Sequence, residues 1–349
     1  MRKSPAISPV PTDSVPNQDH AGSQGVARPP NANKSYTEDG RTVLPILLDQ
    51  FERHGNKTGW QQQEIYKIGA EIDGRKTDLP CYSFTTEREG PAVYLIGGIH
   101  GEEPAGPNAL AKSLALLDHF SDQRTNQRTN PKTSDGQNKK RPKEGIPMVL
   151  IPLANPLGYA LNWRYYDHPS DGRQGHSVGD SEHLLLREDQ QGPRTAQAAS
   201  EYAARFTEHV RSLLERYPPL LSIDFHEDDD IRGPPYIYSQ GPLRSEDLVA
   251  KSVVQLLQKA GMGLQMTGKT TYGEEIRGGI AYTSDGSIDE FLAAEKYWHD
   301  DRAMIKPAAR SVIVVETPIH GVALERRIAA HQSIIRRLPQ LWEMVQERA

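Results

Sequence analysis

Cysteine is nearly absent from this sequence, with Cys81 as the one example among 349 residues. A single cysteine excludes an internal disulfide framework and any zinc module built from several cysteines. Long apolar runs are missing too, because no stretch approaches the roughly 20 residues that a helix needs to span a bilayer. The net charge is −5, so the chain lacks the basic excess typical of nucleic-acid-binding proteins. We therefore expect neither a membrane nor a nucleic acid as a partner.

Signals for export are also missing near the first residue. No apolar segment follows Arg2 and Lys3, so a secretory signal is not expected. The prediction is a cytoplasmic protein. Nothing in the sequence decides its oligomeric state.

Apolar residues make up 36% of the chain, which is low for a globular protein, so parts of it are expected to stay unpacked. Residues 1–42 are rich in Pro, Ser, Asn, Gln and Gly and are predicted to form a disordered tail. The alternative is that part of this tail packs on the domain. Residues 121–145 form a low-complexity insertion whose basic cluster, 139–141, is either a solvated loop or an anion-docking patch.

The rest of the chain, 43–349, alternates uncharged strand patterns with helical patterns. Continuous apolar strands of this kind are typical of a parallel sheet that is buried on both faces. We predict one α/β domain with a mostly parallel, mixed central sheet and helices on both faces. The expected strands are 65–69, 79–84, 92–99, 147–153, 220–225 and 312–315, and the expected helices are 43–54, 104–117, 195–216, 246–259 and 324–347.

Two of these strands end in a histidine flanked by acids. The apolar run 93–99 leads into His100, Glu102 and Glu103, and the strand 220–225 leads into His226. Ligand sites of open α/β sheets lie at the carboxyl ends of the strands. Two histidines and one glutamate, with a fourth position open to water, form the ligand pattern of catalytic zinc. The alternative to a metal site is that His-x-x-Glu lies in a solvated loop and that the histidine after the second strand is an ordinary packed side chain.

Other side chains complete a possible catalytic set. Glu316 ends the strand 312–315 and could act as a general base beside a metal-activated water, or it could cap the next turn. Arg164 lies between aromatic residues and could stabilise an oxyanion, or it could form a surface stacking pair. Asp224, or the acids after His226, could orient a ligand imidazole.

These motifs, in order, resemble the M14 zinc carboxypeptidases and the related succinylglutamate desuccinylase/aspartoacylase amidohydrolases. The resemblance covers roughly residues 60–320 and implies zinc on His100, Glu103 and His226, with Arg164 as the oxyanion partner and Glu316 as the base. Spacing and resemblance together favour Glu103 over Glu102 as the ligand. The matching stretches are 68–75, His100-Gly101-Glu102-Glu103, 155–159, Trp163-Arg164, Asp224-Phe225-His226 and Val315-Glu316.

The resemblance also extends to substrate binding. Residues 284–289 are similar to the segment that lines the specificity pocket of animal carboxypeptidases, which implies Ile288 as a pocket residue. Tyr282 lies one position from the place of that family's mobile, substrate-covering tyrosine. An ordinary surface turn explains these residues equally well. The family's Asn-Arg pair, which binds the substrate carboxylate, has no counterpart in 175–183, and the candidates to replace it are Arg173, Arg187, Arg232 and Arg277.

The sequence therefore predicts a zinc-dependent hydrolase of amide bonds that acts on a peptide or small-molecule substrate. The first hypothesis is an M14-like metallocarboxypeptidase that uses zinc-activated water. The alternatives are an N-acyl amino acid deacylase of the succinylglutamate desuccinylase/aspartoacylase type and a non-catalytic zinc- or ligand-binding protein.

Overall fold

A computed structural model describes residues 39–57, 59–72, 75–121, 145–166, 176–228 and 234–347. Residues 1–38 of the predicted tail and residues 122–144 of the predicted low-complexity insertion lie outside these ranges. Residues 39–42, which we had placed in the tail, are described and contact the domain. Arg41 is 4% exposed there.

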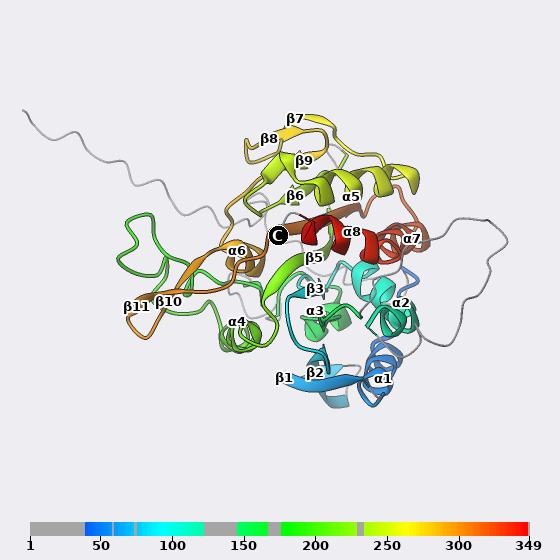
Figure 1. The fold of residues 1–349 in the computed structure, drawn as a ribbon. Coiled ribbons are helices and arrows are strands. Elements are labelled where there is room, and N and C mark those ends of the chain that lie inside the picture. The colour runs from blue at the N-terminus through cyan, green and yellow to red at the C-terminus, as the bar shows by residue number, and fades with distance from the viewer. Residues whose placement is uncertain are drawn as a thin grey trace, which may run out of the picture.

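A mixed ten-stranded sheet forms the centre of the described molecule, and a two-stranded sheet lies beside it (Figure 1). The three pairings at its centre, β4 with β3, β3 with β5 and β5 with β12, are parallel. In order across the sheet the strands are β1 (Trp60–Ile72), β2 (Arg75–Thr86), β4 (Met148–Ile151), β3 (Ala92–Gly97), β5 (Pro219–Asp228), β12 (Ser311–Pro318), β6 (Ile237–Ser239), β9 (Ile280–Ala281), β8 (Glu275–Arg277) and β7 (Thr267–Lys269), while β10 (Lys296–His299) pairs with β11 (Arg302–Ile305).

The central parallel strands have both faces buried and apolar, as is typical of parallel strands covered by helices. Every residue of β3 is buried, and its side chains alternate between two hydrophobic clusters on opposite faces of the sheet. Towards both edges the sheet also contains antiparallel pairings, such as the β1–β2 hairpin and the pairing of β12 with β6. The β1–β2 hairpin is longer than the strands expected from the sequence.

Helices pack on both faces of the sheet, which confirms the predicted α/β fold (Figure 1). The sheet is mixed rather than mostly parallel, because most pairings outside its centre are antiparallel. One cluster contains residues of six helices, and the other contains residues of α4 and α6. The first group is α1 (Leu44–Gly55), α2 (Ala105–Ser121), the short α3 (Pro156–Leu161), α5 (Leu248–Lys259), α7 (Leu324–Ile335) and α8 (Leu338–Gln346); the second is α4 (Glu201–Leu213) and α6 (Ile288–Ala293). A 3₁₀ turn, η3 (Arg244–Glu246), precedes α5.

Two helix boundaries differ from the expected ones. The predicted helix 324–347 is two helices, because the chain turns at Arg336 and Arg337 and a new helix begins with Pro339 in its first turn. The helix expected from 195 begins later, where the Ser200 hydroxyl accepts the N–H of Ala203 and caps α4.

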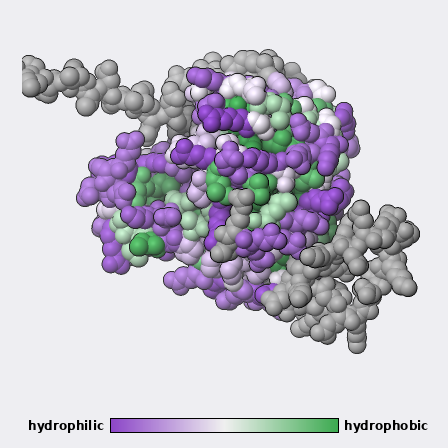
Figure 2. Space-filling view, turned by 45° about the horizontal axis from the view of Figure 1, so that its top comes forward, coloured by the Kyte–Doolittle hydropathy of each residue, from purple (hydrophilic) through white to green (hydrophobic). Residues whose placement is uncertain are grey.

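The surface in Figure 2 is mostly hydrophilic, with small separate hydrophobic patches. Ile46, Leu243, Leu248 and Ile305 are the large apolar side chains that are exposed among the described residues. None of the helices in the described ranges is both long enough and apolar enough to cross a membrane.

Candidate active site

The carboxyl ends of β3, β5 and β12 meet at one edge of the sheet. The parallel registers place Gly97 beside Phe225 and His226 beside Glu316. His100 and Glu103 follow β3 directly, on the turn that enters α2. Three segments far apart in the sequence therefore bring their acids and histidines to one place, as parallel strand ends do.

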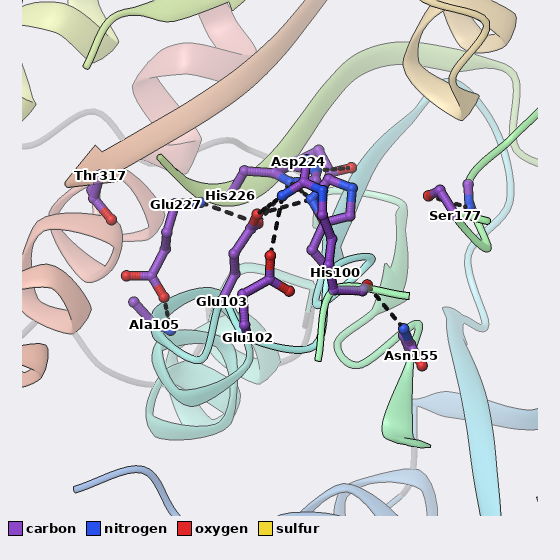
Figure 3. Close-up of polar contacts among 12 residues, drawn as sticks. His100, Glu102, Glu103, Ala105, Asn155, Ser177, Asp224, His226, Glu227 and Thr317 are labelled. Atoms are coloured by element: carbon purple, nitrogen blue, oxygen red, sulfur yellow. Dashed lines mark hydrogen bonds and ion pairs between the residues drawn. The ribbon is translucent and has the colours of Figure 1, made fainter. Parts of the chain in front are cut away.

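His100, Glu103 and His226 converge on one point (Figure 3). His100 Nδ1 lies 2.9 Å from Glu103 Oε1, His226 Nδ1 lies 2.8 Å from Glu103 Oε2, and the two Nδ1 atoms are 3.1 Å apart. Burial alone would raise the pKa of Glu103, but the two imidazoles hold it well below its ordinary value. Two imidazole nitrogens and an ionised carboxylate are a donor set that fits zinc.

Asp224 orients His226 from the side away from this point. Its Oδ2 lies 3.0 Å from His226 Nε2, which leaves Nδ1 directed to the other two groups. Such a carboxylate fixes the tautomer of a ligating imidazole. The acid after His226 has another role: the Glu227 carboxylate accepts the N–H of Ala105 at 2.6 Å and is paired with Arg327 of α7. The Glu227 N–H itself donates to Glu103 Oε2 at 3.2 Å.

The turn that carries His100 needs glycine. A Cβ on Gly101 would lie 1.9 Å from the carbonyl carbon of Gly158, so no other residue fits without moving α3. The close approach lets Gly101 N–H donate to the carbonyl oxygen of Arg164 at 3.3 Å. The turn that carries His100 and the loop that carries Arg164 are thus in direct contact.

Arg164 points into the site. Its Nη1 lies 3.0 Å from Glu103 Oε1 and 3.2 Å from Glu102 Oε1, and its side chain is 30% exposed. The stacking alternative is not what the structure shows. Burial raises the pKa of Glu102 to about 7, against the opposing effect of Arg164. Arg164 therefore contacts both acids, whereas of the two only Glu103 also contacts the two histidines.

Glu316 lies beside the same centre. Burial raises its pKa well above the ordinary value, and the charges of Glu103 and Asp228 add to the rise, whereas His226 and Arg164 oppose it. Its Oε2 is buried and makes no hydrogen bond to another described residue. A carboxyl group with a raised pKa and a free oxygen has the properties of a proton acceptor in catalysis.

The segment 282–290 reaches the site from α6. Asp289, which the sequence did not single out, lies with Asp224 and His226 in a group whose ligand atoms are all within 4.8 Å of one another. Ile288 is fully buried in the cluster under α6. Tyr282 is half-buried, and the guanidinium carbon of Arg244 lies 4.0 Å from its ring centroid.

The region that lacks the Asn-Arg pair contacts this segment. Asp180 forms a bridge with Ser287, and Ser181 N–H donates to Gly286 O at 2.7 Å. A further arginine that the sequence reasoning missed, Arg194, donates from Nη1 to Glu290 Oε2 at 2.8 Å. No local sequence pattern points to Arg194, because 96 residues separate it from its partner Glu290.

Two of the four arginines considered from the sequence, Arg187 and Arg277, are described, and each is paired with an acid of its own stretch. Arg187 lies 3.5 Å from Asp189 and Arg277 lies 2.8 Å from Glu275, and both side chains are largely exposed. Arg277 also belongs to β8, near the far edge of the sheet. Arg173 and Arg232 fall outside the described residues.

Residues 59–310 match the family model described as zinc carboxypeptidase. The chain belongs to the zinc carboxypeptidase family. It is therefore a zinc hydrolase of the metallocarboxypeptidase type, and zinc is its cofactor. Family membership confirms the predicted enzyme class and argues against the non-catalytic alternative.

Solved structures agree with this family in fold. A candidate metallopeptidase from Shewanella amazonensis superposes with a TM-score of 0.58 at 17% identity, over 85% of this chain and 93% of the other. A second candidate metallopeptidase, from Shewanella denitrificans, superposes with a TM-score of 0.56 at 17% identity, over 84% of this chain and 87% of the other. A metallo-carboxypeptidase from Pseudomonas aeruginosa, solved with (2-guanidinoethylmercapto)succinic acid, gives 0.50 at 15% identity, over 85% and 68%. No curated protein matches the sequence.

Proposed function

We propose that this enzyme is a metallocarboxypeptidase in which His100, Glu103 and His226 hold Zn²⁺. The observation that carries the proposal is the convergence of two Nδ1 atoms and one carboxylate, with Glu316 on the neighbouring strand. Zinc supplies Lewis-acid chemistry, because it makes water a stronger acid and polarises a carbonyl group. Side chains of the protein carry out the proton transfers and stabilise the developing charge.

Glu316 is the proton carrier in this proposal. Its carboxylate takes a proton from the attacking water and later gives it to the departing amine, so the peptide C–N bond breaks as the amine becomes neutral. A raised pKa suits both steps, since the group must accept a proton and then return it. Arg164 stabilises the negative charge that develops on the carbonyl oxygen, because its guanidinium already lies beside Glu103.

Tyr282 is proposed to cover the bound substrate. Ile288, which the resemblance implies as a pocket residue, starts α6 but is fully buried in the hydrophobic cluster beneath it, so we propose no substrate contact for it. Gly286 has a φ of +77° and Gly279 a φ of +81°, so glycines flank Tyr282 on both sides where the backbone is left-handed. A cytoplasmic location remains an expectation from the sequence.

The test compares Glu316→Gln with the parent enzyme on blocked dipeptides, unblocked peptides and N-acyl amino acids. We expect release of C-terminal residues by the parent and a loss of about 10³-fold in kcat in the variant, with zinc content unchanged. Glu325→Gln, which alters an exposed glutamate of α7, is the matched control. Retained activity in Glu316→Gln contradicts the proposed base. Hydrolysis of N-acyl amino acids alone would move the assignment to the deacylase type.

A further inference from the structure

Arg41, just before α1, has its guanidinium buried under the two loops of the active site. Its side chain is fully inaccessible, although the sequence places it in a tail. Nη1 donates to the carbonyl oxygens of Gly101 at 3.2 Å and Tyr159 at 2.9 Å. Nη2 donates to Asn162 Oδ1 at 2.5 Å, and Asp39 Oδ2 accepts from Nε at 2.8 Å and from Nη2 at 2.6 Å.

The acceptors of Arg41 belong to both loops that carry catalytic groups. Gly101 lies between His100 and Glu102 in the turn that carries the first proposed zinc ligands, here called the zinc-site turn. Asn162 ends α3 with a left-handed φ of 51° and stands two residues before Arg164. A backbone hydrogen bond also joins the two loops directly: Gly101 N–H donates to the carbonyl oxygen of Arg164 at 3.3 Å.

A guanidinium is suited to this place for a physical reason. Its planar fork can donate to several acceptors at once, whereas an ammonium group is a compact point charge. All three nitrogens of Arg41 have partners, and Asp39 balances the charge. Loss of the fork would leave the Gly101 and Tyr159 carbonyl oxygens without these donors in a buried region, which costs free energy and frees the loops to shift.

Thr42, the residue after Arg41, makes hydrogen bonds to α2 and α3 that do not depend on Arg41. Thr42 N–H donates to Asn108 Oδ1 at 3.0 Å, and Thr42 O accepts from the Tyr159 hydroxyl at 2.7 Å. Asn108 Nδ2 also donates to that hydroxyl at 2.9 Å. A change at Arg41 therefore removes the fork without detaching the segment from α2 and α3.

We propose that Arg41 is a positioning residue of the hydrolase, which sets Arg164 relative to the zinc ligands. Arg41 does not touch the substrate in this role; it acts through the Gly101 and Asn162 loops. Its catalytic consequence rests on the proposed function, but the ordering of the two loops does not. Small misplacements of a group that stabilises charge in the transition state are costly, up to about 100-fold in rate.

The experiment uses full-length Arg41→Ala, Arg41→Lys and Arg164→Ala, the double variant Arg41→Ala/Arg164→Ala, and the exposed Arg53→Ala as control. Arg41→Ala should lower kcat by about 10- to 100-fold with KM and zinc content near those of the parent. Arg41→Lys should not restore kcat, because one ammonium cannot replace the fork. The double variant should be no slower than Arg164→Ala, since residues that act through one another are not additive.

Hydrogen–deuterium exchange supplies a measurement that does not depend on substrate. Peptides covering 98–104 and 158–166 should exchange faster in Arg41→Ala than in the parent or in Arg53→Ala. Unchanged exchange in these peptides, parental kcat in Arg41→Ala, or fully multiplied losses in the double variant would each overturn the proposal. A parent enzyme that cleaves no substrate would count against the proposed function, while the exchange result would still decide the role of Arg41.

Discussion

The end of the sheet that we propose binds zinc (the zinc-binding end) and the segment 282–290 are built in different ways, although they meet at Asp289. His100, Glu103 and His226 each lie within a few residues of the end of a central strand, and neighbouring parallel strands bring them together. The segment 282–290 follows the short strand β9, which lies outside the parallel centre of the sheet, and contacts from residues about 100 positions earlier hold it in place. We infer that strand topology holds the first region in place, whereas a few backbone and side-chain contacts hold the second.

The largest effect is expected from the zinc-binding end. His226→Ala removes one of three converging ligands, so the variant should lose its zinc and show no measurable hydrolysis, a loss of at least about 10³-fold. Zinc per chain, measured on protein purified without added metal, checks this. His119→Ala, on the exposed side of α2, is the control. Zinc retained by His226→Ala would show that the ligand set is wrong.

Asp224→Asn should weaken the same region without removing a ligand. The neutral amide holds the His226 imidazole less firmly, and loss of such an outer partner lowers metal affinity by about 10- to 100-fold. Competition with a zinc chelator measures the change. An affinity equal to that of the parent would mean that Asp224 does not orient His226.

Changes that loosen the segment 282–290 should affect substrate binding more than zinc. Arg194→Ala removes the partner of Glu290, so we expect KM to rise by about three- to tenfold with kcat and zinc content nearly unchanged. Arg187→Ala, which alters an exposed arginine of the same stretch, serves as the control. If Arg194→Ala lost as much zinc as His226→Ala, the proposed difference between the two regions would be wrong.

The smallest effect on catalysis is expected at Lys306, beneath α6. Burial lowers the pKa of this amine to about 7, and its Nζ lies 3.2 Å from the carbonyl oxygen of Pro307. Between about pH 7 and pH 10.5 the unfolded chain binds more protons at this site than the folded chain, so its contribution to stability rises with pH. Lys306→Met should raise the free energy of unfolding at pH 7 by about 1–3 kcal/mol.

Urea unfolding at pH 7 and pH 9 measures this contribution. The advantage of Lys306→Met over the parent should shrink at pH 9, because the folded parent no longer carries the buried charge there. The exposed Lys112→Met should show no such change between the two pH values. An advantage that grows with pH would show that the sign of the contribution is wrong.

The sequence predicted the parts of the molecule that local patterns determine. Apolar runs identified the central strands, and the residues after them included the histidines and acids that the structure brings together. Asp289 and Arg194 were missed because their roles come from contacts across the fold. Arg41 was missed because a polar, Pro-rich stretch surrounds it, and composition does not reveal a buried hydrogen-bond fork. The break before α8 was missed although Pro339 signals it, because a proline within a helical pattern ends one helix and is tolerated in the first turn of the next.

The ion pair between Glu227 and Arg327 links metal binding to a part of the chain beyond the family match, which ends at residue 310. Glu227 also accepts the N–H that begins α2, so one buried carboxylate joins β5, the helix after the zinc-site turn and α7. A chain ending near residue 310 would leave that carboxylate buried without its cation, which is strongly destabilising. The C-terminal helices should therefore unfold in the same cooperative transition as the metal centre, and added zinc should raise the melting temperature of both together.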